Sequence, residues 1–304
     1  MGQGKKTVLI TGGNSGLGLA CAKKIAASQE YQVVLACRSL PKGERAKEEV
    51  AAASGSRAVS VMQLDVSSLA SVRTFAESYR AQQGPLAGLV CNAGIVGLNT
   101  GLTPEGLDVV FATNHLGHFL LTLLLLPALE PQGRIAVVSS DMHCPPGAAL
   151  TWPGALALAR PQPPLAEDRS RYSFSKLCNL YFTHELAARL KALGAGITIN
   201  ALNPGLMPET NFAPDKARFT PEFLQAMADR VGSVESSSGA LAGLVTGPAG
   251  GETSGAYYDR KFGPIPSSPL SYDGKNAREL WDVSVQLTGL TEGETLPGLL
   301  ACEA

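Results

Sequence analysis

Short apolar runs that alternate with helical patterns constrain the fold of this chain more than any other feature. The runs, rich in β-branched residues, predict strands at residues 7–11, 32–36, 58–64 and 88–91, with helices at 17–28, 41–53 and 69–83. Such strands lack polar alternation, so both faces of their sheet must be covered, and right-handed crossovers place helices on both faces. The pattern predicts an α/β fold with a doubly wound parallel sheet, the Rossmann arrangement.

The alternation continues through the second half of the chain. It predicts helices at 113–126, 172–193, 234–246 and 276–287 and strands at 134–139, 197–202 and around 257. No internal repeat or long low-complexity segment divides the chain, so we expect one domain over residues 1–304.

Two stretches interrupt the alternation, each after the carboxyl end of a predicted strand. Residues 141–171 are rich in Pro and Ala, and residues 204–232 carry prolines at 204, 208 and 214. Ligands bind at the carboxyl ends of strands in open α/β sheets. We therefore expect an insertion and a substrate loop, each made of loops or short helices, that shape a pocket. A plain surface insertion is the alternative for 141–171.

Composition and charge exclude several classes of protein. The chain has 25 Lys and Arg against 26 Asp and Glu, with no basic cluster, which disfavours nucleic-acid binding and favours a small-molecule partner. The six cysteines form no Cys-x-x-Cys pair and have no histidine at ligand spacing, so we expect no metal site, no disulfide framework and a reducing, cytoplasmic location. The apolar run 119–126 is shorter than the ~20 residues of a membrane span, so we expect no membrane span. With six residues before the first predicted strand, we also expect no signal peptide or anchor.

Residues 11–18 read Thr-Gly-Gly-Asn-Ser-Gly-Leu-Gly between a predicted strand and a predicted helix. Gly12 would permit a sharp turn, Gly16 a close approach of backbone N–H groups to a pyrophosphate, and Gly18 close packing of helix and sheet. The turn predicts dinucleotide binding that also involves Asn14, Ser15 and Leu17. The alternative is a glycine-rich turn without a ligand.

The residue at the end of the second strand bears on the choice of cofactor. NAD enzymes usually carry an acid there for the ribose hydroxyls, whereas this chain has Arg38. A guanidinium can grip a 2′-phosphate in a charge-assisted pair, so we predict NADP(H), with Ser39 and Lys42 as weaker candidates for the same anion. An ordinary surface arginine is the alternative.

The ends of two further predicted strands are candidates for contact with the adenosine part of the cofactor. Asp65 and Val66 follow the third strand, where the carboxylate could reach the adenine edge or could serve the next helix N-terminus. Asn92, Ala93 and Gly94 end the fourth strand and would pass close to the adenine ribose, although a strand-to-turn segment has the same composition.

Tyr172 and Lys176 are four residues apart in a predicted helix, so their side chains share one face. A phenol of pKa ~10 is a poor acid-base group near neutrality, but an adjacent ammonium and an oxidised nicotinamide would both favour the phenolate. Tyr172 could then give a proton to a carbonyl oxygen or take one from an alcohol. The spacing alone is weak evidence, because it recurs by chance in helices.

The order of these motifs resembles the short-chain dehydrogenase/reductase family over residues 7 to about 210. The resemblance implies a tetrad of Asn114, Ser140, Tyr172 and Lys176, in which Ser140 binds the substrate oxygen, Lys176 the nicotinamide ribose, and Asn114 supports a water relay. Ser139 competes with Ser140 for that role. The segment Asn203-Pro204-Gly205 is similar to the family's turn beside the nicotinamide, and Thr210 is a candidate for its carboxamide.

Segments such as 113–119 and 175–179 look like the branch that holds retinol dehydrogenases and light-dependent protochlorophyllide reductases. The photoenzyme's Pro-Gly-Cys appears here as Pro204-Gly205-Leu206, which favours a dark carbonyl reductase or alcohol dehydrogenase. A light-driven pigment reductase and a catalytically silent NADP(H) sensor are the alternatives.

The 31 residues between Ser140 and Tyr172 resemble the insertion of monomeric carbonyl reductases, so a monomer is favoured. Bulky apolar pocket walls are expected from Met142, His143, Trp152 and Leu206, with ordinary packing as the alternative for each. His115, His118 and Cys91 are expected to serve structure.

Overall fold

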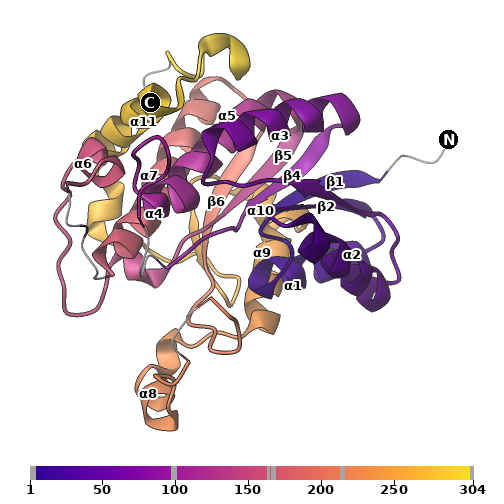
Figure 1. The fold of residues 1–304 in the computed structure, drawn as a ribbon, viewed down its shortest axis with the longest axis horizontal. Helices are drawn as coiled ribbons and strands as arrows, with labels where there is room; N and C mark the ends of the chain where they lie inside the picture. The colour runs from indigo at the N-terminus through magenta and orange to yellow at the C-terminus, as the bar shows by residue number, and fades with distance from the viewer. Residues whose placement is uncertain (1–4, 97–100, 163–164, 166–168, 213–215, 302–304) are drawn as a thin grey trace.

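The computed structural model describes residues 5–96, 101–162, 165, 169–212 and 216–301 and contains a twisted sheet between two helical layers (Figure 1). All seven strands of the sheet are parallel, in the order β3-β2-β1-β4-β5-β6-β7. The strands are β1 Lys6–Thr11, β2 Tyr31–Cys37, β3 Val59–Gln63, β4 Leu86–Cys91, β5 Leu129–Val138, β6 Thr198–Asn203 and β7 Tyr257–Asp259. The order reverses between β1 and β4, which creates a crevice at their carboxyl ends.

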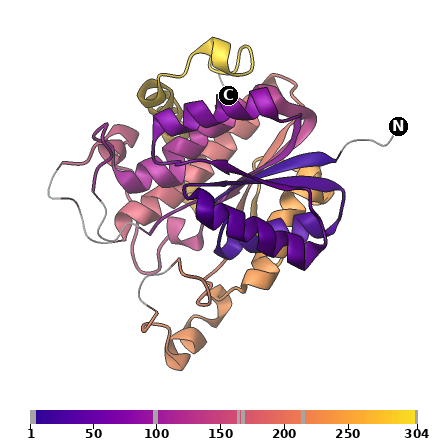
Figure 2. The ribbon, with the colours of Figure 1, turned by 45° about the vertical axis from the view of Figure 1, so that its right-hand side comes forward.

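Helices cover both faces of the sheet, as Figures 1 and 2 show. One layer contains α1 (Gly16–Ala27), α2 (Leu40–Ser54) and α9 (Val234–Thr246). The other contains α3 (Leu69–Gln82), α5 (Gly117–Leu125) and α7 (Ser170–Ala192), with α11 (Gly274–Thr288) packed on α7. Successive side chains of β1 point to opposite faces of the sheet, as strand geometry requires. Leu9 packs in the apolar core on one face, and Val8 and Ile10 pack in the core on the other. The predicted doubly wound sheet is confirmed.

One helical segment runs through the centre of the molecule. Residues 109–128 combine α4 (Val109–Phe111), a π-helical turn η1 (Ala112–Leu116), α5 and the 3-10 turn η2 (Leu126–Ala128). Within the described ranges this is the one helix long and apolar enough to cross a membrane, and 94% of its most apolar window is buried inside the protein. Gly117 makes this packing possible, because a Cβ there would lie 1.8 Å from the carbonyl oxygen of Val66.

The described part of the 141–171 insertion packs mainly away from the sheet's crevice. After the turn η3 (Asp141–His143), α6 (Ala155–Ala159) lies against α7 and α11 in a shared apolar cluster. Trp152 donates its indole N–H to Glu279 Oε2 at 2.7 Å and sets its ring edge-on to Tyr181. Trp152 is therefore not a pocket wall, which corrects the expectation from sequence.

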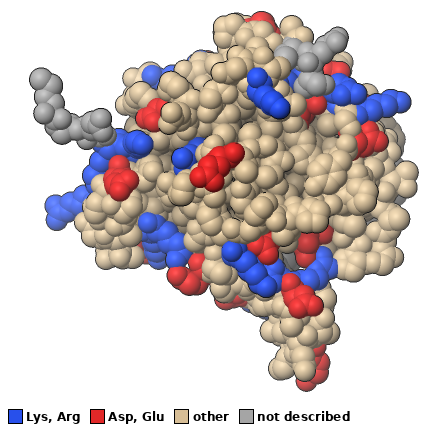
Figure 3. Space-filling model, turned by 180° about the vertical axis from the view of Figure 1, so that it is seen from behind, with Lys and Arg blue, Asp and Glu red and all other residues tan. Residues whose placement is uncertain are grey.

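The loop that follows β6 includes α8 (Pro221–Ala226) and the turn η4 (Ala228–Arg230), and α8 projects from the body of the molecule (Figures 1 and 2). No residue of α8 is buried. Short helices were among the expectations for the two interrupting stretches, but the sequence did not predict the bounds of α6, α8 or α10 (Ala249–Glu252). Acidic and basic side chains intermingle on the face seen in Figure 3, without a continuous basic patch.

Candidate active site

A cavity of about 740 Å³ opens at the carboxyl ends of the strands, where the strand order reverses. Its wall combines the β1–α1 turn, the ends of the next strands, α7 and the loop after β6. Most of the residues predicted from the sequence lie on this wall: Gly12, Asn14, Ser15, Gly16, Leu17, Arg38, Asp65, Val66, Asn92, Ala93, Gly94, Ser140, Tyr172, Lys176, Pro204, Gly205 and Thr210. Gly18, Ser39, Lys42 and Asn114 do not line it.

The β1–α1 turn has the shape of an anion cradle. Gly12 and Gly16 take positive φ angles of 64° and 52°, which other residues rarely adopt. The helix α1 starts at Gly16, and its N-cap Ser15 makes no side-chain cap bond, so the first N–H groups are left for a ligand at the positive end of the helix dipole. These features fit a dinucleotide pyrophosphate. Gly18 acts through packing, since a Cβ there would meet Gly12 O at 2.7 Å.

Buried hydrogen bonds lock the ends of β1 and β4 together beside this turn. The Thr11 hydroxyl oxygen accepts from the backbone N–H groups of Asn92 at 2.9 Å and Ala93 at 3.0 Å. The Asn92 side chain donates back to Thr11 O at 2.9 Å. His118 completes the arrangement, with Nε2 at 2.8 Å from Thr11 Oγ1 and Nδ1 at 3.4 Å from the Asn114 carbonyl. Burial lowers the pKa of His118 to about 4, so it is a neutral structural residue, as expected.

Arg38 extends from the end of β2 onto the cavity wall and is exposed. Its guanidinium forms no ion pair with any residue of the described ranges, so it is available to a ligand anion. Ser39 is the N-cap residue of α2 and makes no side-chain cap bond, and neither it nor Lys42 lies on the cavity wall, so their weaker assignment to the same anion stays a prediction. Asp65 accepts from Ser67 N and Ser67 Oγ, at 3.0 and 2.6 Å, and so shapes the turn after β3.

Tyr172 and Lys176 meet on one face of α7, as their spacing predicted. The Lys176 ammonium lies 5.5 Å from the centre of the Tyr172 ring and donates to Val138 O at 2.9 Å. Burial lowers the pKa of Lys176 to about 8. Burial also raises the pKa of Tyr172 above its ordinary value, opposed by its hydrogen bond with Ser140. The Tyr172 phenol is thus less acidic than its spacing from Lys176 predicted, because desolvation and the negative charge of Asp141 together outweigh the hydrogen bond with Ser140.

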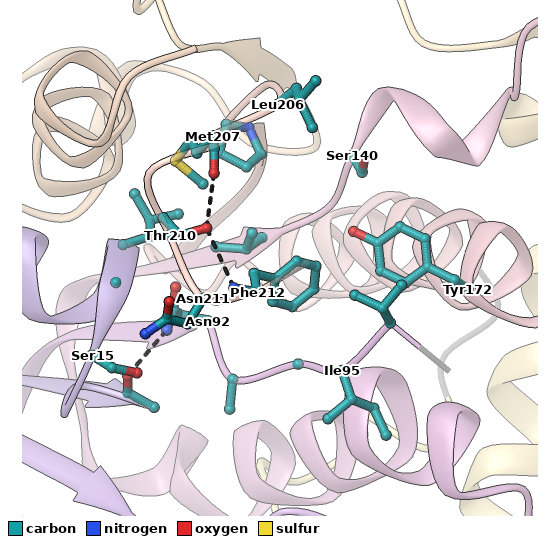
Figure 4. Close-up of a pocket in the computed structure, with 18 of the residues that line it drawn as sticks. Ser15, Asn92, Ile95, Ser140, Tyr172, Leu206, Met207, Thr210, Asn211 and Phe212 are labelled. Atoms are coloured by element: carbon teal, nitrogen blue, oxygen red, sulfur yellow. Dashed lines mark hydrogen bonds between the residues drawn. The ribbon is translucent and has the colours of Figure 1, made fainter. Parts of the chain in front are cut away.

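The two serines at the end of β5 have different surroundings. Ser139 is 1% exposed, and its hydroxyl donates to the backbone oxygen of Lys176 at 2.8 Å, a buried bond between β5 and α7. Ser140 lies next to the hydroxyl end of Tyr172 in Figure 4. Geometry therefore favours Ser140 over Ser139 as the residue that meets a substrate oxygen.

Asn114 lies behind the cavity, in the π-helical turn η1. Its amide exchanges two hydrogen bonds with the backbone of Ile95, at 2.8 and 3.0 Å, and donates to Ser175 Oγ at 2.9 Å. These contacts brace the segment after β4 against α7. Both N–H donors of the Asn114 amide are used in these contacts and are not free to donate to a water, so its part in a water relay stays a prediction.

The substrate end of the cavity is mostly apolar and was only partly predicted. Met142 and Leu206 line it as expected, whereas His143 is buried behind Ser140 and corrects that expectation. The Phe212 ring lies 6.0 Å from the Tyr172 ring (Figure 4). The residues that sequence reasoning missed on this wall include Val96, Asp141, Met207, Phe212, Arg218, Phe219, Phe223, Met227 and Arg230. Only Asp141 had a usable signal, since it directly follows the candidate serine at a strand end.

No group of three or more His, Cys, Asp or Glu side chains suited to a metal occurs within the described ranges. The five cysteines in those ranges are free thiols, and Cys302 lies outside them. Cys91 is buried, which raises its pKa to about 12 and makes it a poor nucleophile.

Comparison with known proteins agrees with this geometry. Residues 6–151 match the family model described as short chain dehydrogenase. The chain is 34% identical to a protochlorophyllide reductase of Chlamydomonas reinhardtii, covering 95% of this chain and 79% of that one. It is also 34% identical to the human dehydrogenase/reductase SDR family member 13, over 95% of this chain and 74% of that protein.

Solved structures show the same architecture. A protein from Mycobacterium paratuberculosis is 32% identical and superposes with a TM-score of 0.68, covering 93% of each chain. A blue fluorescent protein from a metagenomic library, crystallised with NADPH, is 25% identical with a TM-score of 0.65, over 84% of this chain and 97% of that one. With its parallel sheet, phosphate turn and Ser-Tyr-Lys wall, this chain belongs to the short-chain dehydrogenase/reductase family of oxidoreductases, which use nicotinamide cofactors.

Proposed function

We propose that this protein is an NADP(H)-dependent oxidoreductase that transfers hydride between the nicotinamide and a carbonyl or alcohol group of a bulky apolar small molecule. The observation that carries the proposal is the convergence of Ser140, Tyr172 and Lys176 on the cavity that also contains the phosphate turn. The apolar side chains around Phe212 support a bulky substrate.

The residues on the wall suit this chemistry. A bound nicotinamide would supply or accept the hydride. Tyr172 donates its phenolic proton to the carbonyl oxygen during reduction and takes the alcohol proton in the reverse direction. Ser140 stabilises that oxygen with a hydrogen bond, for which its hydroxyl proton turns from Asp141 Oδ1 to the substrate. Lys176 holds the nicotinamide ribose and adds positive charge that favours the phenolate.

Arg38 supports the preference for NADP(H). It stands at the end of β2 on the cavity wall, with its guanidinium donors directed at no carboxylate of the described residues. A 2′-phosphate bound there would gain a charge-assisted contact, on the order of 1.5–3 kcal/mol.

NADPH oxidation, followed at 340 nm in darkness with a panel of apolar ketones and aldehydes, tests the proposal. We expect turnover by the wild-type protein and a loss of at least about 100-fold in kcat for Tyr172→Phe, because the general acid is removed while the ring is kept. NADPH fluorescence should show unchanged cofactor affinity in that variant. Tight NADPH binding without turnover across the panel would favour a catalytically silent sensor instead.

A light-driven pigment reductase is the second candidate, because relatives of this chain carry the name protochlorophyllide reductase. Leu206, on the cavity wall, stands where the resemblance implies a cysteine. Activity with a tetrapyrrole under illumination, and none in darkness, would reverse the order of the two proposals. We also propose a monomer, since α6 packs against α7 and α11, and the insertion that contains α6 resembles that of monomeric carbonyl reductases.

A further inference from the structure

The Asp141 carboxylate lies between the candidate catalytic serine and an arginine of the substrate loop. Ser140 Oγ donates to Asp141 Oδ1 at 3.2 Å and accepts from Met142 N at 3.1 Å. The other carboxylate oxygen, Asp141 Oδ2, accepts from Arg230 Nε. Asp141 and Arg230 are both partly buried and both line the cavity.

The backbone on each side of this ion pair is well held. His143 Nε2 accepts from Ser268 N at 2.9 Å, so its Nδ1 carries the proton and donates to Ser140 O at 2.7 Å. On the loop, Leu206 N donates to Arg230 O, and Gly232 N donates to Leu206 O, both at 2.8 Å. The pair therefore joins two supported segments and is not a contact between loose side chains.

We propose that Asp141 and Arg230 form a positioning pair, in which Asp141 orients the Ser140 hydroxyl and Arg230 ties that orientation to the substrate loop. The inference rests on the proposed function, since that function assigns Ser140 its role. It predicts that the loop affects the reaction at Tyr172 through charge as well as through shape.

The groups that face Asp141 determine how its charge acts. Tyr172 faces it from α7, Tyr257 from β7, His143 from its own turn and Arg230 from η4. Burial lowers the pKa of His143, which keeps the imidazole neutral, and Asp259 also acts on Tyr257. Among the described residues, Arg230 is the one cation in an ion pair with Asp141. Without it, the carboxylate would disfavour a Tyr172 phenolate by like-charge repulsion.

Opposite charge changes in the two residues test the pair. The assay is alcohol oxidation with NADP, in which the phenolate is the reactive form, measured as kcat against pH for the best substrate of the panel. Arg230→Gln should move the rising limb of the profile to higher pH, on the order of 0.5–1 pH unit. Asp141→Asn should move it to lower pH, and the double variant should return close to the wild type.

Arg230→Lys separates charge from geometry. It keeps the positive charge but not the guanidinium fork, so we expect the wild-type limb position with a kcat several-fold lower, because Asp141 is held less firmly. This variant also serves if Arg230→Gln does not fold. NADPH affinity within twofold of the wild type confirms an intact cofactor site in each variant.

The surface pair Lys23–Glu49 supplies matched controls. Lys23→Gln and Glu49→Gln make the same two charge changes on exposed helices and should leave the profile in place, because solvent screens them. Limbs that shift in the same direction in Arg230→Gln and Asp141→Asn, or do not shift in either, would overturn the positioning pair. A wild-type protein without turnover would instead overturn the proposed function.

Discussion

The phosphate turn and the substrate loop border the same cavity but are held in different ways. The turn lies between β1 and α1 and is fixed by buried bonds among Thr11, Asn92 and His118. The loop is attached by a short backbone bridge at Leu206 and carries α8, which buries no side chain. The cofactor surface is thus part of the core, whereas the substrate surface can change without disturbing the core. The residues for the chemistry and those for the choice of substrate are thus supported in different ways, and the Asp141–Arg230 pair is where the two regions meet.

The most severe test of the rigid region is a methyl group at Gly18. In Gly18→Ala the new Cβ would meet Gly12 O at 2.7 Å and Asn92 Nδ2 at 2.6 Å, so the turn must shift. We expect NADPH affinity, measured by fluorescence titration, to fall on the order of 100-fold. Gly239→Ala is the matched control, because its Cβ would find no atom closer than 3.9 Å. Equal affinities in the two variants would show that the turn is not rigid.

An effect of similar size concerns the buried ammonium of Lys176. Its pKa of about 8 in the folded protein, against an ordinary value of 10.5, means that the charged form destabilises the fold below pH 8. Lys176→Met should therefore raise the free energy of unfolding at pH 7 by up to about 3 kcal/mol, at about 1.4 kcal/mol per pH unit. The difference should shrink as pH rises from about 8 towards 10.5, when the folded wild type has already lost the proton. Urea titrations at pH 7 and 10 measure it, and a less stable variant at pH 7 would contradict it.

Arg38 sharpens the comparison within the cofactor region. Arg38→Asp should raise the KM for NADPH on the order of 10–100-fold and leave that for NADH much less changed, because only NADPH carries the 2′-phosphate. Arg45→Asp, on the exposed side of α2 and off the cavity wall, is the control for charge. Equal effects on the KM values of the two cofactors would show that Arg38 does not bind the 2′-phosphate.

The smallest effect is expected in the substrate loop. Phe212→Ala removes an aromatic contact with Tyr172, on the order of 1 kcal/mol, so the KM for apolar ketones should rise a few-fold with NADPH affinity unchanged. Leu156→Ala, exposed on α6, is a control for the loss of a surface apolar side chain. A large loss of cofactor affinity in Phe212→Ala would show that loop and turn are coupled and would break the comparison.

The fold could be predicted from the sequence because its strands are buried on both faces and its helices have a clear hydrophobic periodicity. The strand boundaries agree within about two residues except for β5, which starts at Leu129 and not at residue 134. There a register shift separates the Leu86–Leu129 pair from the regular pairing at Arg134, and Pro131 and Gly133 hide the strand signal. Short elements such as α8 carry too few residues for a periodic pattern to show.

The candidate site likewise contains residues that the sequence could predict and residues that it could not. Gly12, Gly16, Tyr172 and Lys176 could be found because a local spacing expresses each function. Arg230 could not, since it reaches Asp141 across 89 residues of sequence through the fold of the loop. Apolar substrate contacts such as Phe212 also carry no motif, because any large side chain can fill that space.

The burial of the imidazoles has a consequence for how this protein responds to acidity. All four histidines have lowered pKa values through burial, with His115 at about 3 and His118 at about 4. His118 therefore stays neutral and keeps its hydrogen bond with Thr11, beside the junction of β1 and β4, across the pH range in which a free histidine titrates. Unfolding below pH 6.5 takes up protons at these sites, so mild acid weakens the whole fold before it alters the crevice.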